Sequence, residues 1–265
     1  MATRYISPTG GASTQDGLTA DTAYAIGSLA TAETEAGSSG TILFLDGTYS
    51  VNFDVTGLTY QSLNKHGAAY TNGSIGSGAS TSPIFKDFVV TKNADYVQSF
   101  GSETIIDGCL ITATNINQGF FNRTNGSAST SKFINNILFF EPSAGTNRYL
   151  MAGFGFFNEL SGNTFFVKTG NLSAGQLSTS VGSQYISSSN TFKNNILATD
   201  DATNGIFNTV NVAQHASNCC FHQSGTNNTS GGTNNKFSDP LFVDSANSDY
   251  RLRPSSPCIN AGTAS

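Results

Sequence analysis

Apolar runs return at a nearly regular interval along this chain, and a short acid or amide residue stands just before each run. In five successive segments the acid or amide residue is Asp107, Asn136, Asn163, Asn190 and Asn218, which follow one another at spacings of 29, 27, 27 and 28 residues. A period of about 20–50 residues is typical of solenoids, in which each repeat buries its apolar edge against its neighbours. The pattern therefore predicts stacked coils of parallel strands.

The recurring asparagine has a physical role at a bend between strands. A turning residue often needs a positive φ, which Asn tolerates better than most residues. Stacked Asn side chains can also hydrogen-bond along the axis and satisfy the polar groups inside the turn. Two positions after the bend we expect one apolar core column: Cys109, Leu138, Phe165, Phe192 and Cys220.

A second register is compatible with the same period. The segment 133–138 closely matches 192–197, and that match places Asn195 rather than Asn190 opposite Asn136. The two registers differ by five residues, and both remain open at this point.

The N-terminal 40 residues have a different pattern. Ala25 to Ala36 is expected to form a short helix that caps the open end of the solenoid, because an exposed first coil would recruit other strands. We therefore divide the chain into a cap region, 1–40, and a parallel β-helix, 41–265. The Gly- and Ser-rich segment 61–82, which carries Tyr70, is expected to be a surface loop.

Both ends of the chain resemble a known group of proteins. Segments 237–244 (FSDPLFVD) and 249–262 (DYRLRPSSPCINAG) look like the last coils of right-handed parallel β-helix proteins of the pectate-lyase-like superfamily. Segments 5–10 and 41–50 are similar to the first coil of that group. The resemblance implies an all-β chain, a single-stranded right-handed parallel β-helix of about eight coils with a short N-terminal cap. It leaves the activity open, because the superfamily implies polysaccharide lyases, hydrolases, epimerases, phage tailspikes and catalytically silent adhesion modules.

The composition argues against nucleic-acid binding and against a membrane-spanning protein. Only 11% of the residues are charged, against about 25% in an average soluble domain, and the net charge is −5. A negative chain is a poor non-specific binder of nucleic acid, so we expect no nucleic-acid partner. No stretch approaches the ~20 apolar residues of a membrane span, so we expect no membrane partner.

Four cysteines stand at positions 109, 219, 220 and 258. Their spacing does not resemble that of a zinc site. We interpret them as buried reduced thiols acting as small apolar side chains. Cys109 and Cys220 are expected four coils apart in one column, which is too far for a disulfide. A Cys220–Cys258 bridge is the remaining alternative.

Several acidic and basic residues are candidates for polysaccharide chemistry. Lyases need a base and a means of neutralising the uronate carboxylate, often calcium. Asp200 and Asp201, with Lys193 and Lys168, are the best such group, although a solvated acidic turn explains them equally simply. Hydrolases of this fold use two or three carboxylates, and the available acids are Asp87, Asp95, Glu103 and Asp107.

The three histidines are His66, His215 and His222, of which the last two flank the Cys219–Cys220 pair. A Cys/His nucleophilic pair is one hypothesis, but no orienting acid is evident beside it. Since none of these groups forms a recognisable motif, we predict no catalytic, cofactor-binding or metal-ligating residue and no cofactor.

Doubled phenylalanines recur at 120–121, 139–140, 156–157 and 165–166. Neighbours on a strand face opposite sides, so one of each pair points outward unless a bend intervenes. A row of outward Phe on stacked coils would mark a protein interface.

These observations favour a structural or adhesive β-helix module, namely a phage virion appendage or capsid decoration protein. We expect a homo-oligomer, a trimer among its forms, or contacts with virion proteins, and a surface glycan as a further ligand. Residues 1–8 lack the apolar core of a signal peptide, so we expect release in a virion by lysis, and otherwise a cytoplasmic location. The alternative is a polysaccharide lyase or glycoside hydrolase acting in a groove on the β-helix, and the balance leans away from an enzyme.

Overall fold

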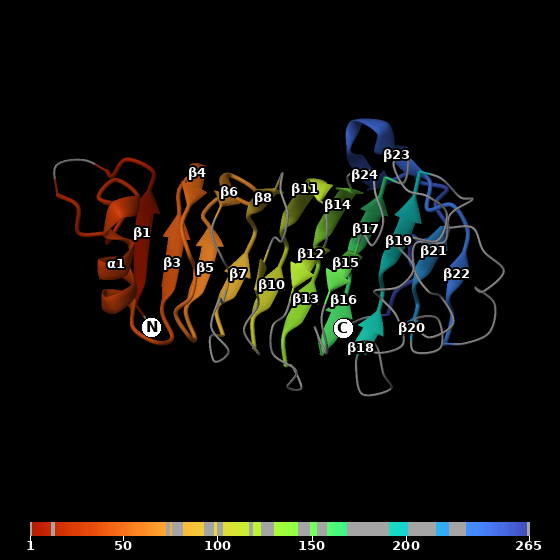
Figure 1. Cartoon of the computed structure of the whole chain (residues 1–265), viewed down its shortest axis with the longest axis horizontal. Helices are drawn as coiled ribbons and strands as arrows, with labels where there is room; N and C mark the ends of the chain where they lie inside the picture. Colours follow the sequence, from red (N-terminus) through yellow and green to blue (C-terminus); the bar gives the residue numbers. More distant parts are fainter. Residues whose placement is uncertain are drawn as a thin grey trace.

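The computed structural model describes residues 2–11, 14–72, 75, 82–92, 98–99, 103–116, 119–122, 130–142, 149–152, 158–168, 191–200, 216–222 and 232–263. Three sheets of parallel strands stack along the long axis of the molecule (Figure 1). Sheet A contains, in spatial order, β2 (Tyr24–Ala25), β1 (Thr3–Ser7), β3 (Thr41–Phe44), β5 (Thr59–Ser62), β7 (Ile84–Lys86), β10 (Ile105–Asp107), β13 (Lys132–Ile134), β16 (Glu159–Ser161), β18 (Thr191–Lys193) and β20 (Ala216–Ser217).

Sheet B runs beside sheet A and receives the chain directly from it. Its strands are β4 (Gly47–Ser50), β6 (Ala68–Asn72), β8 (Val89–Lys92), β11 (Leu110–Ile116), β14 (Ile137–Pro142), β17 (Thr164–Val167), β19 (Ile196–Thr199), β21 (Cys220–His222) and β22 (Lys236–Phe237). Sheet C contains β9 (Gln98–Ser99), β12 (Gly119–Asn122) and β15 (Tyr149–Ala152).

This arrangement confirms the predicted all-β parallel β-helix. Sheet A has eight successive strands from β3 to β20, in agreement with about eight coils. The predicted short helix is also present, as a 3-10 turn η1 (Ile26–Ser28) followed by α1 (Leu29–Ala36). Leu29, Ala32 and Ala36 of α1 join the core, and β1 extends sheet A, so the N-terminal region supplies both a cap and first strands.

Only two residues separate each strand of sheet A from the following strand of sheet B between β10 and β21. The first has a positive φ, as in Asn135 (56°) and Asn194 (57°), and the second points into the core. The inward column contains Cys109, Asn136, Asn163, Asn195, Cys219 and Asn235.

The bend positions of Asn136 and Asn163 are therefore confirmed, and the alternative register through Asn195 is the right one. Asp107 was placed wrongly, because it ends β10 two residues before Cys109 of the inward column. Asn218 lies in its turn with the positive φ expected of a bend residue (53°), but Cys219 takes the inward position. Asn190 lies outside the described residues. Steps along the column are 27, 27, 32, 24 and 16 residues, because the segments that close each coil differ in length while the two-residue turn does not.

The same shift corrects the predicted core column. Leu138 and Phe165 are paired neighbours in sheet B, and Leu197 and Phe221 continue their column. Phe192 instead belongs to sheet A, where it pairs with Leu160. Cys109 lies in the turn column, and Cys220 pairs with Ile196, so Cys109 and Cys220 do not share a column.

The segment 61–72 was wrongly expected to be a loop. It contains the end of β5, a turn and β6, and the Tyr70 side chain is fully buried against Phe53 and Phe85. The Gly and Ser residues that follow it in 73–82 led the whole segment to be interpreted as a loop.

The chain ends by folding back over sheet B. The antiparallel hairpin of β23 (Phe242–Asp244), the 3-10 turn η2 (Ser245–Asn247) and β24 (Asp249–Leu252) lies beside β14 and β17 in Figure 1. Phe242 and Tyr250 of this C-terminal hairpin pack on Phe166 and Ala198, the outward residues of β17 and β19.

This covering changes the interpretation of the doubled phenylalanines. Phe140 and Phe165 point inward, and outward Phe139 and Phe166 stack on each other and on Tyr250. For these two pairs the expected interface with another protein is wrong, because the chain's own hairpin covers them. The side chains of the pairs at 120–121 and 156–157 lie outside the described part of the structure.

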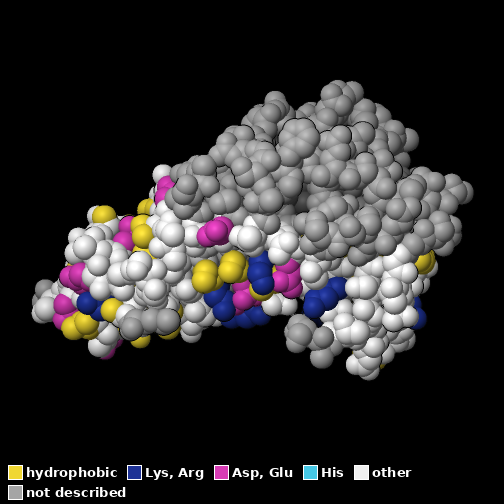
Figure 2. Space-filling view, turned by 90° about the horizontal axis from the view of Figure 1, so that it is seen from below, with side chains coloured by type: hydrophobic (Ala, Val, Ile, Leu, Met, Phe, Trp, Pro, Cys, Tyr) yellow, Lys and Arg dark blue, Asp and Glu magenta, His cyan; other side chains and the backbone are white. Residues whose placement is uncertain are grey.

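On the described part of the lower face, acidic and basic side chains lie next to one another (Figure 2). Two ion pairs span neighbouring coils on the outer face of sheet A, Lys86–Asp107 and Lys132–Glu159. Within the ranges described, the helices are too short or too polar to cross a bilayer.

Candidate functional site

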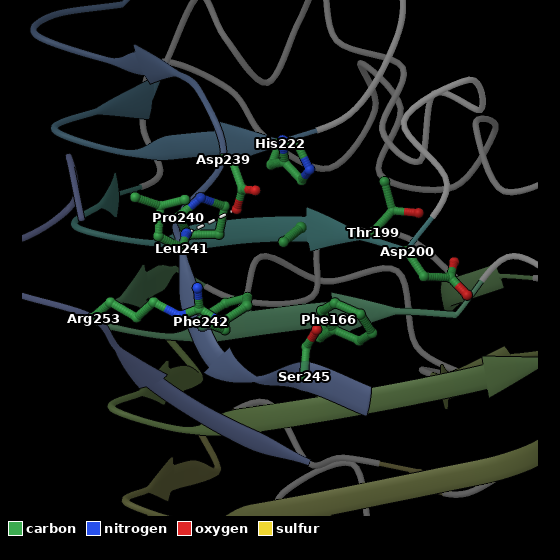
Figure 3. Close-up of a pocket in the computed structure, with 11 residues that line it drawn as sticks. Phe166, Thr199, Asp200, His222, Asp239, Pro240, Leu241, Phe242, Ser245 and Arg253 are labelled. Atoms are coloured by element: carbon green, nitrogen blue, oxygen red, sulfur yellow. Dashed lines mark hydrogen bonds between the residues drawn. The ribbon is translucent and has the colours of Figure 1, made fainter. Parts of the chain in front are cut away.

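A cleft of about 350 Å³ opens between the outer face of sheet B and the C-terminal hairpin (Figure 3). Asp200 and His222 enter it from the ends of β19 and β21. Asp239 comes from the segment before β23, Ser245 from η2, and Arg253 from the residue after β24. Side chains far apart in the sequence thus meet because the hairpin folds back.

The outward column of sheet B shapes the floor of this cleft. Phe166, Ala198 and His222 are direct neighbours on β17, β19 and β21. Because Ala198 is small and stands between two large side chains, the floor is hollow at its centre. The volume lies within the ~300–1,000 Å³ typical of small-molecule sites.

The wall opposite is held by the backbone of the hairpin. The Asp239 carboxylate accepts the Leu241 N–H at 2.8 Å, and Leu241 has a positive φ of 55°. The Arg253 N–H donates to the Leu241 carbonyl at 2.9 Å, and the Arg253 guanidinium donates to the Val243 carbonyl at 2.9 Å. Asp239 and Arg253 are thereby fixed relative to each other.

A second compartment of about 320 Å³ adjoins the first. It shares Phe166, Asp200 and Ser245 with the larger one and adds Phe139 and Lys168. The Lys168 ammonium contacts the Glu141 carboxylate at 2.8 Å, and Glu141, with a smaller contribution from Asp200, raises the pKa of Lys168. The two compartments form one elongated cleft with carboxylate, imidazole, guanidinium and ammonium groups along it.

This geometry brings together only part of the predicted lyase group. Asp200 and Lys168 line the same compartment, as the hypothesis required. Lys193 does not join them, because it pairs with Ser161 and Ser217 on sheet A, where inward Phe192 turns it to the outer face. Asp201 lies outside the described residues. Among the residues described, no three His, Cys, Asp or Glu side chains are grouped closely enough to hold a metal ion.

The acids considered for a glycosidase lie elsewhere. Asp107 pairs with Lys86 at 3.3 Å, and Asp87 accepts a hydrogen bond from Gln61 at 3.0 Å, both at sheet A. Glu103 is exposed just before β10. These groups do not line the cleft, and Asp95 lies outside the described residues.

The histidines also separate. His66 occupies a turn, where its Nε2 contacts the Gly108 carbonyl at 2.9 Å, and His215 lies outside the described part. His222 lines the cleft, but the hypothesis of a Cys/His nucleophile gains no support. The interaction with Cys258 and burial both raise the pKa of the Cys220 thiol, which disfavours the thiolate a nucleophile needs.

Asp239 and Arg253 were missed as site residues. Both belong to the C-terminal segments that carry the resemblance to β-helix proteins, so the sequence marked them as fold residues. The Ser-Asp-Pro turn signal at 238–240 was visible, but nothing local says which sheet that turn will cover.

Comparison with known proteins supports the fold. No family model matches the chain, and none of the curated proteins matches it. Among solved structures, the crystal structure of pectate lyase Pel9A is similar, with a TM-score of 0.52 and 12% sequence identity over 100% of this chain and 92% of that one. At that identity the likeness shows a shared parallel β-helix and does not carry an activity across.

Proposed function

We propose that this protein is an adhesive β-helix module that binds a polysaccharide in the cleft between sheet B and the C-terminal hairpin. The observation that carries the proposal is the convergence of Asp200, His222, Asp239 and Arg253 on one open cleft from separate segments of the chain. Folding places these polar groups around a cavity, although the core would be equally well covered without them.

The chemistry of the lining suits a sugar. Each carboxylate accepts hydrogen bonds from hydroxyl groups, whereas the Arg253 and Lys168 side chains donate them. The same two cations would bind the carboxylate of an acidic sugar, since guanidinium and ammonium groups form charge-assisted bonds with it. Because the structurally similar protein is a pectate lyase, a pectate-like acidic polysaccharide is the first ligand to test.

Binding fits this site better than β-elimination. A lyase base must give up its proton near the working pH, but the raised pKa of Lys168 keeps that side chain protonated. The second candidate is a glycoside hydrolase, favoured by the presence of two carboxylates, Asp200 and Asp239, in one cleft.

The setting we propose for the module is a phage virion, as an appendage or decoration protein, with identical subunits or other virion proteins as partners. The support is compositional: a sparsely charged chain rich in Gly, built as a long rigid stack. Light scattering during gel filtration tests the oligomer, and a monomer at all concentrations would remove the trimeric arrangement.

Calorimetric titration with acidic and neutral oligosaccharides tests the binding site. We expect Arg253→Gln to weaken binding about tenfold or more, the size of one lost charge-assisted bond. Arg251→Gln is the matched control, because Arg251 lies on β24 two residues before Arg253 and pairs with Asp249 instead of lining the cleft. Equal affinities of both variants and the unmodified protein would overturn the assignment.

The titrated samples are then assayed for reducing ends and for unsaturated uronate products. Binding without either product supports the adhesive module. New reducing ends that disappear in both Asp200→Asn and Asp239→Asn would replace it with the hydrolase.

A further inference from the structure

The thiols of Cys220 and Cys258 lie close enough together for each to change the pKa of the other. Cys220 is on β21, where its side chain faces out of sheet B and is only 2% exposed. Cys258 is in the turn that follows the C-terminal hairpin and is partly exposed. Both are free thiols. The Cys220 sulfur donates a hydrogen bond of 3.5 Å to the Ser238 carbonyl, and Cys258 follows Ser256, whose hydroxyl bonds to Pro240 in the same segment.

The backbone around Cys258 is fixed on both sides. Upstream, the Ser256 hydroxyl donates to the Pro240 carbonyl and accepts the Cys258 N–H at 3.1 Å. Downstream, the Asn194 side chain forms hydrogen bonds of 2.8 and 3.0 Å with the Thr263 backbone. The thiol contact is therefore part of a specific docking of the tail onto the solenoid.

The two thiols are not equivalent. The interaction with Cys220 is the largest cause that lowers the pKa of Cys258, and Ser256 contributes to the same lowering. Burial of Cys258 and the negative charge of Asp239 both oppose this lowering of its pKa. Cys220, in turn, has Cys219 as a further neighbouring thiol. Cys258 is thus the more readily ionised and the more exposed of the two thiols, and Cys220 is the second thiol near it. Redox-sensitive cysteine pairs have this arrangement.

The other two cysteines do not compete for this pairing. Cys219 faces the core, where its sulfur contacts the Ser217 carbonyl at 3.4 Å and lies 3.4 Å from the Asn195 amide nitrogen. Cys109 is buried at the turn beside Asn136.

We propose that Cys258 and Cys220 form an oxidation site, at which a peroxide converts the two thiols into a disulfide that fastens the C-terminal tail to β21. The Cys258 thiolate attacks one peroxide oxygen, the O–O bond breaks, and hydroxide leaves and takes up a proton. The resulting sulfenic acid is attacked by the Cys220 sulfur, which loses its proton as the S–O bond breaks and water leaves. Two thiols are oxidised by two electrons, and one hydrogen peroxide is reduced to two waters.

The disulfide between Cys220 and Cys258 would also affect the wall of the cleft. It closes a loop from residue 220 to residue 258, and that loop contains Asp239 and Arg253 of the cleft wall. A cross-link removes conformations from the unfolded chain and limits local opening between its ends. Oxidation therefore limits local opening of the hairpin that forms the cleft wall, and a thiol reductant removes this restriction by reducing the disulfide. This inference does not depend on what the cleft binds.

The test treats the full chain with one equivalent of hydrogen peroxide and counts thiols after denaturation. We expect two of the four thiols to disappear and to return with dithiothreitol. Peptide mapping of Cys219→Ser, which removes the neighbour of Cys220, should still show the 220–258 link. Cys109→Ser is the matched control and should lose two of its three thiols in the same way. Four remaining thiols, oxidation of Cys258 to higher acids without a link, or a link to Cys219 would each overturn the proposal.

A thermal melt of the same samples tests the fastening. The disulfide should raise the unfolding midpoint by about 4–12 °C, and Cys258→Ser should show no peroxide-dependent shift. If the link forms but the midpoint of the oxidised protein does not move, the tail is not fastened by it, and that half of the proposal fails.

Discussion

The asparagine and cysteine positions of the turn column fill the same place in the turn with different chemistry. In the middle, the Asn163 oxygen accepts the Asn136 backbone N–H at 2.9 Å, and its amide donates to the Phe133 carbonyl at 2.8 Å. The Asn163 amide also reaches the Asn195 oxygen at 3.0 Å, so each amide supports the next. At Cys109 and Cys219 a thiol takes this place, and its contacts to the corresponding carbonyls of Phe85 and Phe192 lengthen to 3.9 and 4.0 Å.

The difference shows when a buried amide is useful in a solenoid. An amide in the core must have its donors and acceptors satisfied, or it costs more than it contributes. Asn136, Asn163 and Asn195 satisfy this condition because each has a neighbour in the next coil. A thiol demands less, so it can end or interrupt the column without leaving a strong donor unpaired.

The largest effect should come from the middle of the column. Asn163→Ala leaves the Asn136 N–H and the Phe133 carbonyl buried without their partner, so we expect a loss of about 3–5 kcal/mol in the free energy of unfolding. Urea denaturation measures it. Asn158→Ala, at an exposed position before β16, should stay within about 0.5 kcal/mol. A loss of less than about 1 kcal/mol for Asn163→Ala would show that the ladder is not a stabilising unit.

The positive-φ position of the turn should give the next effect. Gly162 has φ 68°, and a Cβ there would lie 2.6 Å from the Asn135 side-chain oxygen in the neighbouring coil. Gly162→Ala should therefore cost about 1–2 kcal/mol, again by urea denaturation. Gly27→Ala is the control, because Gly27 has open space around it. Equal stabilities of the two variants would contradict the proposed crowding between turns.

Placing an amide at the Cys219 position of the column should have the opposite effect and raise the stability. In Cys219→Asn, the new oxygen can accept the Asn195 N–H in place of sulfur, and the new amide can reach the Phe192 carbonyl. We expect a gain of about 0.5–1.5 kcal/mol, seen as a higher thermal midpoint. Cys219→Ala is the comparison that lacks both bonds. If Cys219→Asn is no more stable than Cys219→Ala, the ladder cannot be extended at this coil.

The smallest effect should come from the outer face of sheet A. Lys132, followed by Ser161, lowers the pKa of Glu159, and the Lys132–Glu159 ion pair is 2.9 Å long with partly exposed side chains. Because the folded pKa is depressed, this stabilisation is present above the ordinary value of 4.5 and disappears as the pH falls through the folded value.

Lys132→Met should thus lower the free energy of unfolding by at most about 0.5 kcal/mol at neutral pH. The difference should vanish in strong acid and in about 1 M salt. Denaturation at the two pH values measures it, and a difference that persists in strong acid would contradict an electrostatic origin.

Much of the fold was accessible from local pattern. Asn136 and Asn163 marked bends correctly because a polar residue followed by an apolar strand is a local signal. The register failed at Asn190 and Asn218, where the closing segments change length and a fixed period no longer predicts the next turn. Tyr70 was missed for a related reason, since Gly and Ser around it suggested a loop.

The candidate site was accessible only in part. Asp200 and Lys168 were singled out as members of an acidic and basic group suited to lyase chemistry, and the structure places both on the cleft. Asp239 and Arg253 needed the hairpin to fold back over sheet B, a long-range event driven by burial of Phe242 and Tyr250 on Phe166. Lys193 looked close in sequence but faces away, because strands on different sheets point their side chains in different directions.

The sequence by itself determined that this chain coils into stacked parallel strands, because alternation along a strand and amide-tolerant turns are properties of a few adjacent residues. Tertiary structure decided which asparagines stack, where the C-terminal hairpin lies, and which charged groups share a cleft. Those outcomes depend on burying apolar surface between segments far apart along the chain, and the length of each intervening segment sets how far the chain has wound before they meet.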